Sequence, residues 1–183
     1  MIKPIFLFGS GVLRKVAQPA DIKRKEEIAQ LVTDLKETLA SSEGCGLSAP
    51  QIGQSTRVII VDGDVMKDVY PYLEGFRRTL INPVVVQESE EQISYNEGCL
   101  SVPGVYCDVS RPKKIKVEYY DEDLNKKTEV FDNFAARMIQ HEMSHLDGVL
   151  FTDLVAPIRR KIISKKLQKI SAGKVGTHYK STF

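Results

Sequence analysis

The stretch NFAARMIQHEMSHLDG, residues 133–148, decides how this chain folds and what chemistry it can carry. We predict that it forms one helix, on which His141 and His145 lie one turn apart and face the same side. Both imidazoles can then reach a single metal ion, and Glu142 can contact a water on that ion without ligating it. Such an ion lowers the pKa of water, while a nearby carboxylate takes and returns the proton. The stretch therefore predicts metal-assisted hydrolysis.

A catalytic metal site also needs a third protein ligand and an open position. Two arrangements found in zinc proteases fail here, because Phe151 stands where a third histidine would be and no glutamate follows Glu142. The ligand must come from upstream, and Cys99 is the candidate, since Gly98 before it leaves room for close backbone approach. A thiolate with two imidazoles can hold Fe²⁺, Zn²⁺, Ni²⁺ or Co²⁺. Cys107 has no such setting, and we expect it to be a packed core thiol.

The segments around this helix predict an α+β domain, in which mixed or antiparallel strands pack around a central helix that carries the His-Glu-x-x-His motif. Helical spacing of apolar residues predicts an N-terminal helix over 25–39, which the glycines of 43–46 would end with left-handed backbone. Asp132 or Asn133 can cap the central helix, and Gly148 can end it. Strands are predicted at residues 57–62, 80–87, 115–120 and 128–131, a strand or turn at 4–8, an irregular excursion at 63–79, and a C-terminal helix at 155–170.

The composition is that of an ordinary globular protein. With 183 residues, 42% hydrophobic and 27% charged, the chain suits one compact core and is too short for two typical domains. No apolar run approaches the roughly 18 residues of a membrane span. Three cysteines are an odd number, which does not suit a disulfide framework. We expect a single domain over 1–183, in the cytoplasm and without a membrane partner.

Charge is spread unevenly along the chain. The segment 157–183 holds 8 of the 26 Lys or Arg residues and none of the 24 acidic ones, which leaves 18 basic residues elsewhere. A basic C-terminal helix and tail on an acidic body indicates either an anionic partner or a solvated surface helix, and both interpretations stay open.

The stretch 44–53 is dense in glycine and small residues. Such a segment can bring backbone donors and acceptors against a ligand, and Gln51 within it could supply a side-chain amide to a developing oxyanion. A tight helix-to-strand connection would have the same composition.

Residues 44–51, 97–101 and 140–145 read GCGLSAPQ, EGCLS and QHEMSH. In this order they resemble the three motifs of the peptide deformylases, Gly-x-Gly-Leu-Ala-Ala-x-Gln, Glu-Gly-Cys-Leu-Ser and Gln-His-Glu-x-Asp-His. The segment 11–17 also resembles the family's N-terminal segment, so the likeness covers most of the chain. Two positions depart from the pattern, because Ser48 replaces an alanine and Ser144 replaces the aspartate before the second histidine.

The resemblance implies a hydrolase that removes the formyl group from the N-terminal formyl-methionine of nascent polypeptides and releases formate. Cys99, His141 and His145 would bind one divalent ion, typically Fe²⁺ in this family, and Glu142 would be the general acid/base. Residue 144 is not a ligand in this scheme, so the metal site should stay intact with a serine there. The contact that the family's aspartate carboxylate makes beside the site should be lost.

The resemblance also implies how substrate is held. The Gln51 amide and the Leu100 backbone N–H would stabilise the tetrahedral oxyanion, and backbone groups near Gly46 would pair with the peptide as an added strand. We expect Phe134 and Met138 of the central helix to line a pocket for the methionine side chain. Both could instead be ordinary core residues. The expected substrate-binding residues are Cys45, Gly46, Gly98, Phe134 and Met138.

In an enzyme that acts on nascent chains, we expect the basic segment 157–183 to dock on ribosomal RNA. We expect its deletion from Pro157 onward to spare activity on short formyl-methionyl peptides and to weaken salt-sensitive ribosome binding. We expect a monomer.

Two competing interpretations remain. Another amidase or peptidase could use the same cysteine and histidines, and formate release from a formyl-methionyl peptide separates it from a deformylase. A non-catalytic, metal-stabilised ribosome-binding module would tolerate Glu142→Ala, whereas the enzyme would lose nearly all turnover and keep its metal.

Overall fold

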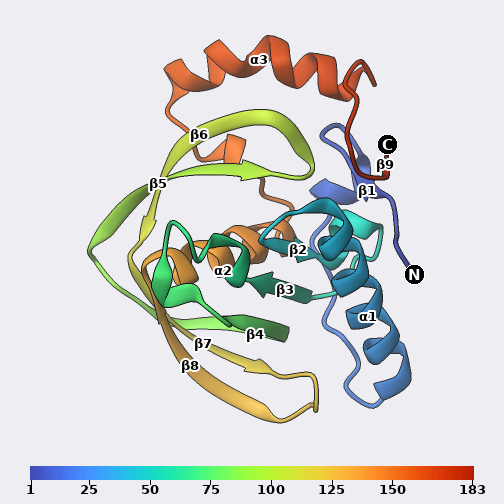
Figure 1. Ribbon diagram of the computed structural model, residues 1–183, viewed down its shortest axis with the longest axis vertical. Coiled ribbons are helices and arrows are strands. Elements are labelled where there is room, and N and C mark those ends of the chain that lie inside the picture. Colours follow the sequence, from blue (N-terminus) through green and yellow to red (C-terminus); the bar gives the residue numbers. More distant parts are fainter.

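The computed structural model describes residues 1–183 and shows an α+β arrangement of helices and mainly antiparallel strands (Figure 1). The main elements, in chain order, are β1 (Ile5–Phe6), α1 (Lys25–Ser42), β2 (Gly46–Ser48), β3 (Val58–Asp62), β4 (Arg77–Glu88), β5 (Gln92–Cys99), β6 (Val102–Pro112), β7 (Lys114–Tyr120), β8 (Lys126–Asp132), α2 (Asn133–Leu146), α3 (Pro157–Ser171) and β9 (Ser181–Thr182). Short 3₁₀ turns are η1 (Gly11–Arg14), η2 (Ala49–Ile52), η3 (Asp64–Met66), η4 (Pro71–Leu73) and η5 (Phe151–Asp153). The predicted fold class is confirmed.

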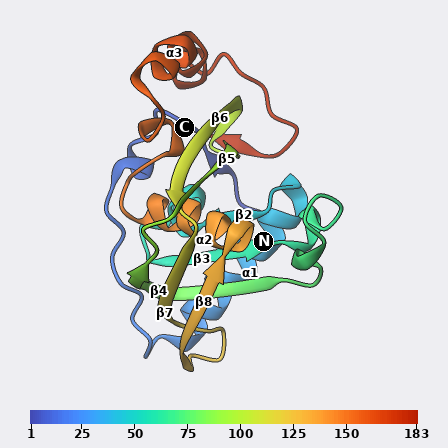
Figure 2. The same cartoon turned by 90° about the vertical axis from the view of Figure 1, so that its left-hand side faces the viewer.

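Helix α2 lies in the middle of the molecule. Five antiparallel strands in the order β2-β3-β4-β7-β8 lie on one side of it, and the β5–β6 hairpin lies on the other (Figures 1 and 2). Helix α3 covers the far side of that hairpin, and β9 pairs in parallel with β1. The two ends of the chain therefore meet beside the hairpin.

Strand β3 is covered on both of its faces. Its run of apolar residues is buried along nearly its whole length, which is typical of a strand packed on two sides. Ile59 and Val61 belong to the apolar cluster that includes α2, whereas Val58 and Ile60 belong to the cluster that includes α1. The sheet is thus held between α1 and α2, and this fixes α2 at the centre.

The end of α1 and the start of α2 are capped by other residues than the sequence predicts. Helix α1 ends at Ser42, and Glu43, with φ 59°, takes the left-handed conformation that we expected of a glycine. Asp132 occupies the N-cap position of α2 but makes no capping bond with its side chain. The Tyr72 hydroxyl accepts the Phe134 N–H instead, at 3.3 Å, so the excursion at 63–79 helps to satisfy the start of α2.

Strand β2 was not predicted from the sequence, and neither were two larger features. No strand is predicted between residues 88 and 114, yet the long β5–β6 hairpin fills this range. The second feature is the C-terminal tail, residues 172–183, which returns to pair with β1 through β9. None of the helices is both long and apolar enough to cross a membrane.

Candidate metal centre

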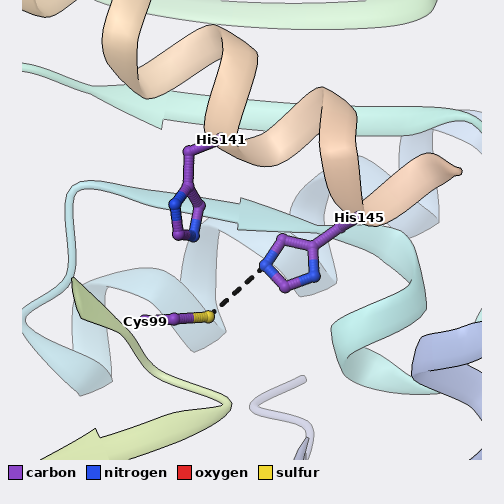
Figure 3. Close-up of side chains that lie close together, drawn as sticks. All are labelled: Cys99, His141 and His145. Atoms are coloured by element: carbon purple, nitrogen blue, oxygen red, sulfur yellow. Dashed lines mark hydrogen bonds between the residues drawn. The ribbon is translucent and has the colours of Figure 1, made fainter. Parts of the chain in front are cut away.

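Helix α2 and the end of β5 bring three donor groups together. Both His141 and His145 project from buried positions on α2 toward Cys99, the last residue of β5 (Figure 3). His145 Nε2 lies 3.3 Å from Cys99 Sγ, and the ligand atoms of the three residues all lie within 4.8 Å of one another. Tetrahedral bonds of roughly 2.0–2.3 Å place ligand atoms roughly 3.3–3.6 Å apart. The donor set therefore fits one divalent ion.

A buried carboxylate orients the first histidine. Glu97 Oε1 accepts a hydrogen bond from His141 Nδ1 at 2.7 Å, which leaves Nε2 as the nitrogen free to ligate. Arg111 donates to the same carboxylate from Nε at 2.8 Å and from Nη2 at 3.0 Å. Burial opposes ionisation of Glu97, but these bonds outweigh it and hold the pKa of the carboxyl below its usual range.

A second arginine completes this network. The Arg137 side chain is buried, and its Nη1 donates to Glu97 Oε2 at 2.5 Å and to the Val109 carbonyl at 2.6 Å. Its Nη2 donates to the Ile93 carbonyl at 2.6 Å. Arg137 therefore ties α2 to both strands of the β5–β6 hairpin. Neither arginine was predicted from the sequence, and neither was the separate role of Glu97, although Glu97 opens the Glu-Gly-Cys motif.

Burial sets the protonation of the remaining groups. It is the main cause that holds the pKa of His145 well below its usual value, with the neighbouring His141 as the next cause, so this imidazole is neutral and can ligate. Burial also lowers the pKa of His141, but contacts with Cys99 and Glu97 outweigh it and raise that pKa to about 10, so a metal ion that binds at Nε2 must displace a proton from it. Burial raises the pKa of Glu142 to about 7. A carboxyl with this pKa can accept and release a proton near neutral pH.

Gln51 is held with its amide nitrogen toward Cys99. Its Oε1 accepts from the Ser48 backbone N–H at 2.9 Å and from the Ser48 hydroxyl at 3.0 Å. Its Nε2 donates to Ser101 Oγ at 3.1 Å and lies 3.5 Å from Cys99 Sγ. The serine that replaces the family's alanine thus adds a bond that fixes the direction of the amide.

The second departure from the family pattern, Ser144, still contacts the network. Arg111 Nη1 donates to Ser144 Oγ at 2.9 Å, and the hydroxyl in turn donates to the Gln140 carbonyl at 2.9 Å. A neutral hydroxyl therefore takes the place of a carboxylate beside Arg111, whose ionic partner is Glu97 alone.

These groups open onto a cavity of about 730 Å³. The expected substrate-binding residues all line it, from β2 and the loop before it, from β5 and from α2: Cys45, Gly46, Gly98, Phe134 and Met138. Gln51, Leu100, His141 and Glu142 line it as well. Phe134 and Met138 also belong to the main apolar cluster, so they are core residues as well as cavity residues, and their contact with a methionine side chain stays a prediction.

The C-terminal tail forms part of the same cavity. Gly176, Thr177, His178 and Tyr179 are among its lining residues. The expectation that the chain can be cut at Pro157 without affecting the site therefore does not fit the structure, because such a cut removes one wall of the cavity.

Comparisons with known proteins agree with this geometry. The family model described as polypeptide deformylase matches residues 2–161. The peptide deformylase of Flavobacterium johnsoniae is 41% identical, over 100% of this chain and 96% of that protein, and that of Flavobacterium psychrophilum is 42% identical, over 98% and 96%. Solved peptide deformylases from Plasmodium falciparum and Thermus thermophilus both superimpose with TM-score 0.83, at 29% and 32% identity. They cover 92% and 94% of this chain, and the matches span 95% and 99% of those chains. This chain belongs to the peptide deformylase family.

Proposed function

We propose that this protein is a metal-dependent deformylase, which hydrolyses the N-formyl amide of formyl-methionyl nascent peptides and releases formate. The observation that carries the proposal is the convergence of the Cys99, His141 and His145 donor atoms within 4.8 Å of one another. Glu142 lines the same cavity, and its Oε2 has no hydrogen-bond partner in the protein. An unpartnered carboxylate oxygen beside a metal-binding triad is placed to handle the proton of an attacking water.

The three donors would hold Fe²⁺, and the same thiolate and imidazoles also suit Zn²⁺, Ni²⁺ or Co²⁺. When bound, the ion supplies Lewis-acid activation of the formyl carbonyl and of water. Glu97 keeps His141 in the ligating tautomer, as its hydrogen bond to Nδ1 indicates.

Glu142 would take a proton from the attacking water and return it to the leaving amide nitrogen. The water oxygen joins the formyl carbon, the C–N bond breaks, and formate and a free amino terminus leave. The Gln51 amide and the Leu100 backbone N–H would donate to the oxyanion that forms between these steps. Both residues line the cavity with Glu142.

The peptide would bind along β2. This strand is at the edge of the main sheet, so backbone groups at Cys45 and Gly46 can pair with an extended peptide as an added strand. Phe134 and Met138 would receive the methionine side chain. Backbone pairing with one apolar pocket suits a substrate that is defined by its first residue and variable beyond it.

The basic helix α3 would dock on ribosomal RNA. Lys161, Lys165 and Lys169 are exposed and recur every four residues, which puts them in one stripe along the outer side of the helix. The helix covers the hairpin on the side away from α2, so docking there leaves the metal centre unobstructed. We place the enzyme in the cytoplasm as a monomer that meets chains as they emerge.

Formate release tests the proposal. Protein purified without oxygen, because a thiolate-bound iron is prone to oxidation, should release formate from a formyl-Met-Ala dipeptide and contain one divalent ion per chain. A chelator should abolish the release, and Fe²⁺ should restore it. Cleavage of the Met-Ala bond without formate would support the other amidase or peptidase, and formate release that survives metal removal would refute the proposal.

A further inference from the structure

The tight turn between β5 and β6 is held by the two ends of the chain. This turn, Leu100–Ser101, directly follows Cys99. The Tyr179 hydroxyl donates to the Leu100 carbonyl at 2.5 Å, and the Phe8 backbone N–H donates to the Ser101 carbonyl at 2.7 Å. Both carbonyls of the turn are thus bound by residues far from it in the sequence.

Tyr179 and Phe8 flank the β1–β9 pair, with Tyr179 two residues before β9 and Phe8 two residues after β1. The Ile5 N–H donates to the Lys180 carbonyl and the Leu7 N–H to the Thr182 carbonyl, each at 2.9 Å. Inside the tail, Thr177 Oγ1 donates to the Tyr179 carbonyl at 2.7 Å. The Tyr179 carbonyl and the residues after it are therefore held by these bonds, and its hydroxyl meets the turn from a segment anchored to β1.

The Leu100 side chain is confined from the opposite direction. A Cβ placed on Gly44 would lie 2.8 Å from Leu100 Cδ1, so the leucine packs directly against the backbone that begins the substrate-binding segment. Leu100 and Tyr179 both pack on the apolar cluster that contains Leu39 and Leu47. Leu100 therefore has its side chain set by Gly44 and this cluster, and its carbonyl set by Tyr179.

We propose that Tyr179 is a positioning residue for deformylation, which acts through Leu100. Its hydroxyl holds the Leu100 carbonyl, and packing against Gly44 holds the Leu100 side chain, so the backbone at the Leu100 Cα has little freedom to turn. This limits the adjoining peptide plane, which carries the Leu100 N–H that would meet the developing oxyanion. This inference rests on the proposed function, in which the Leu100 N–H is an oxyanion donor. It makes the C-terminal tail part of the catalytic apparatus and separates the tail from the basic helix before it.

Tyr179→Phe tests the proposal, because it removes the hydroxyl and keeps the ring. Loss of a whole oxyanion donor costs about 10²–10³ in kcat, and a donor that is merely loosened should cost about tenfold. The variant should therefore lose about tenfold in kcat for formate release, with KM within about twofold of wild type, since the N–H acts mainly on the transition state. Metal content should stay at the wild-type value, and Tm should fall by no more than the few degrees expected for the loss of one hydrogen bond.

Tyr120→Phe is the matched control. Tyr120 is half-buried on the same apolar cluster, and its hydroxyl makes no hydrogen bond within the protein, so its loss should leave kcat unchanged. A Tyr179→Phe enzyme with wild-type kcat would overturn the inference. So would a change in KM alone, which would assign Tyr179 to peptide binding, or a loss that metal content fully explains. Wild-type protein that releases no formate would instead refute the proposed function itself.

Discussion

Glu142 lies with its carboxylate against the backbone of Gly46, so close that a Cβ on this glycine would be 2.6 Å from Oε1. The contact joins the base to the segment that we expect to bind the peptide. A glycine is needed here for close approach, since Gly46 has no positive φ that would require one. In the proposed function, the same residue would serve both substrate pairing and the placement of the base.

Gly46→Ala should displace the Glu142 carboxylate and lower kcat for formate release by at least about 10²-fold, the usual contribution of a general acid/base. Metal content should not change, because none of the three ligands is touched. Gly11→Ala is the control, since nothing lies within 4 Å of the position where its Cβ would be. A Gly46→Ala enzyme within twofold of wild type would show that Glu142 is not held by this contact.

At the scale of elements, an ion pair with a tyrosine beside it joins three strands of the main sheet. Arg78 of β4 donates to Glu129 of β8 from Nε at 2.9 Å and from Nη2 at 2.7 Å, and the Tyr119 hydroxyl of β7 donates to it at 2.7 Å. Burial opposes ionisation of Glu129, but these bonds outweigh it and hold its pKa below the ordinary value of 4.5. This stabilisation is complete above that pH and is lost as pH falls through the lower, folded-state pKa.

Glu129→Gln should lower the free energy of unfolding at pH 7 by about 1 kcal/mol, a modest figure because the carboxylate is partly exposed. The difference in unfolding free energy between wild type and variant should shrink as the pH falls below about 4.5. There the wild-type carboxyl becomes protonated, first in the unfolded state and at lower pH in the folded state. Urea unfolding of both proteins at several pH values measures this. Glu88→Gln, an exposed change on β4, should show no such difference. A difference that persists at low pH would mean that packing rather than charge is lost.

The elements that could be predicted are those whose burial produces a regular pattern of apolar residues in the sequence. β3 is a run of apolar residues because both its faces are covered, and β7 alternates because one face is. The β5–β6 hairpin was missed because its alternating buried positions include Cys107 and Arg111, so the apolar signal is diluted.

Some residues of the site can be predicted from sequence motifs, and others are recognised only once folding has brought distant segments together. Each donor of the candidate metal centre was predicted from the sequence, because motif spacing indicates the two histidines and the glycine before Cys99 indicates the third ligand. Arg137 and Tyr179 could not be predicted, because each acts through a contact that joins segments distant along the chain. A single arginine or tyrosine carries no pattern until the hairpin and the tail are in place.

At the scale of the whole molecule, the C-terminal 27 residues consist of two parts for which we expect different roles. Helix α3 presents lysines outward, while the tail beyond it lines the cavity. Ribosome binding and catalysis should therefore be separable by changing charges on α3, and not by cutting the chain.

Lys161→Glu, Lys165→Glu and Lys169→Glu together should weaken ribosome binding and reduce its salt dependence by about 2–3 in the slope of log K against log salt. Turnover of a short formyl-methionyl peptide should not change. Lys114→Glu, Lys116→Glu and Lys126→Glu make the same charge change on exposed positions of β7 and β8 and should leave ribosome affinity unaffected. Equal affinity of the α3 variant and wild type would refute docking through this helix.

The central claim is that Glu142 performs the proton transfers of deformylation beside an ion held by Cys99, His141 and His145. Glu142→Gln keeps the shape of the side chain and removes its basicity. Formate release by anaerobically prepared, metal-analysed protein tests the claim most directly. The variant should keep one divalent ion per chain and lose at least about 10²-fold in kcat. Wild-type turnover by the metal-loaded variant would contradict the assignment of Glu142 as the catalytic acid/base.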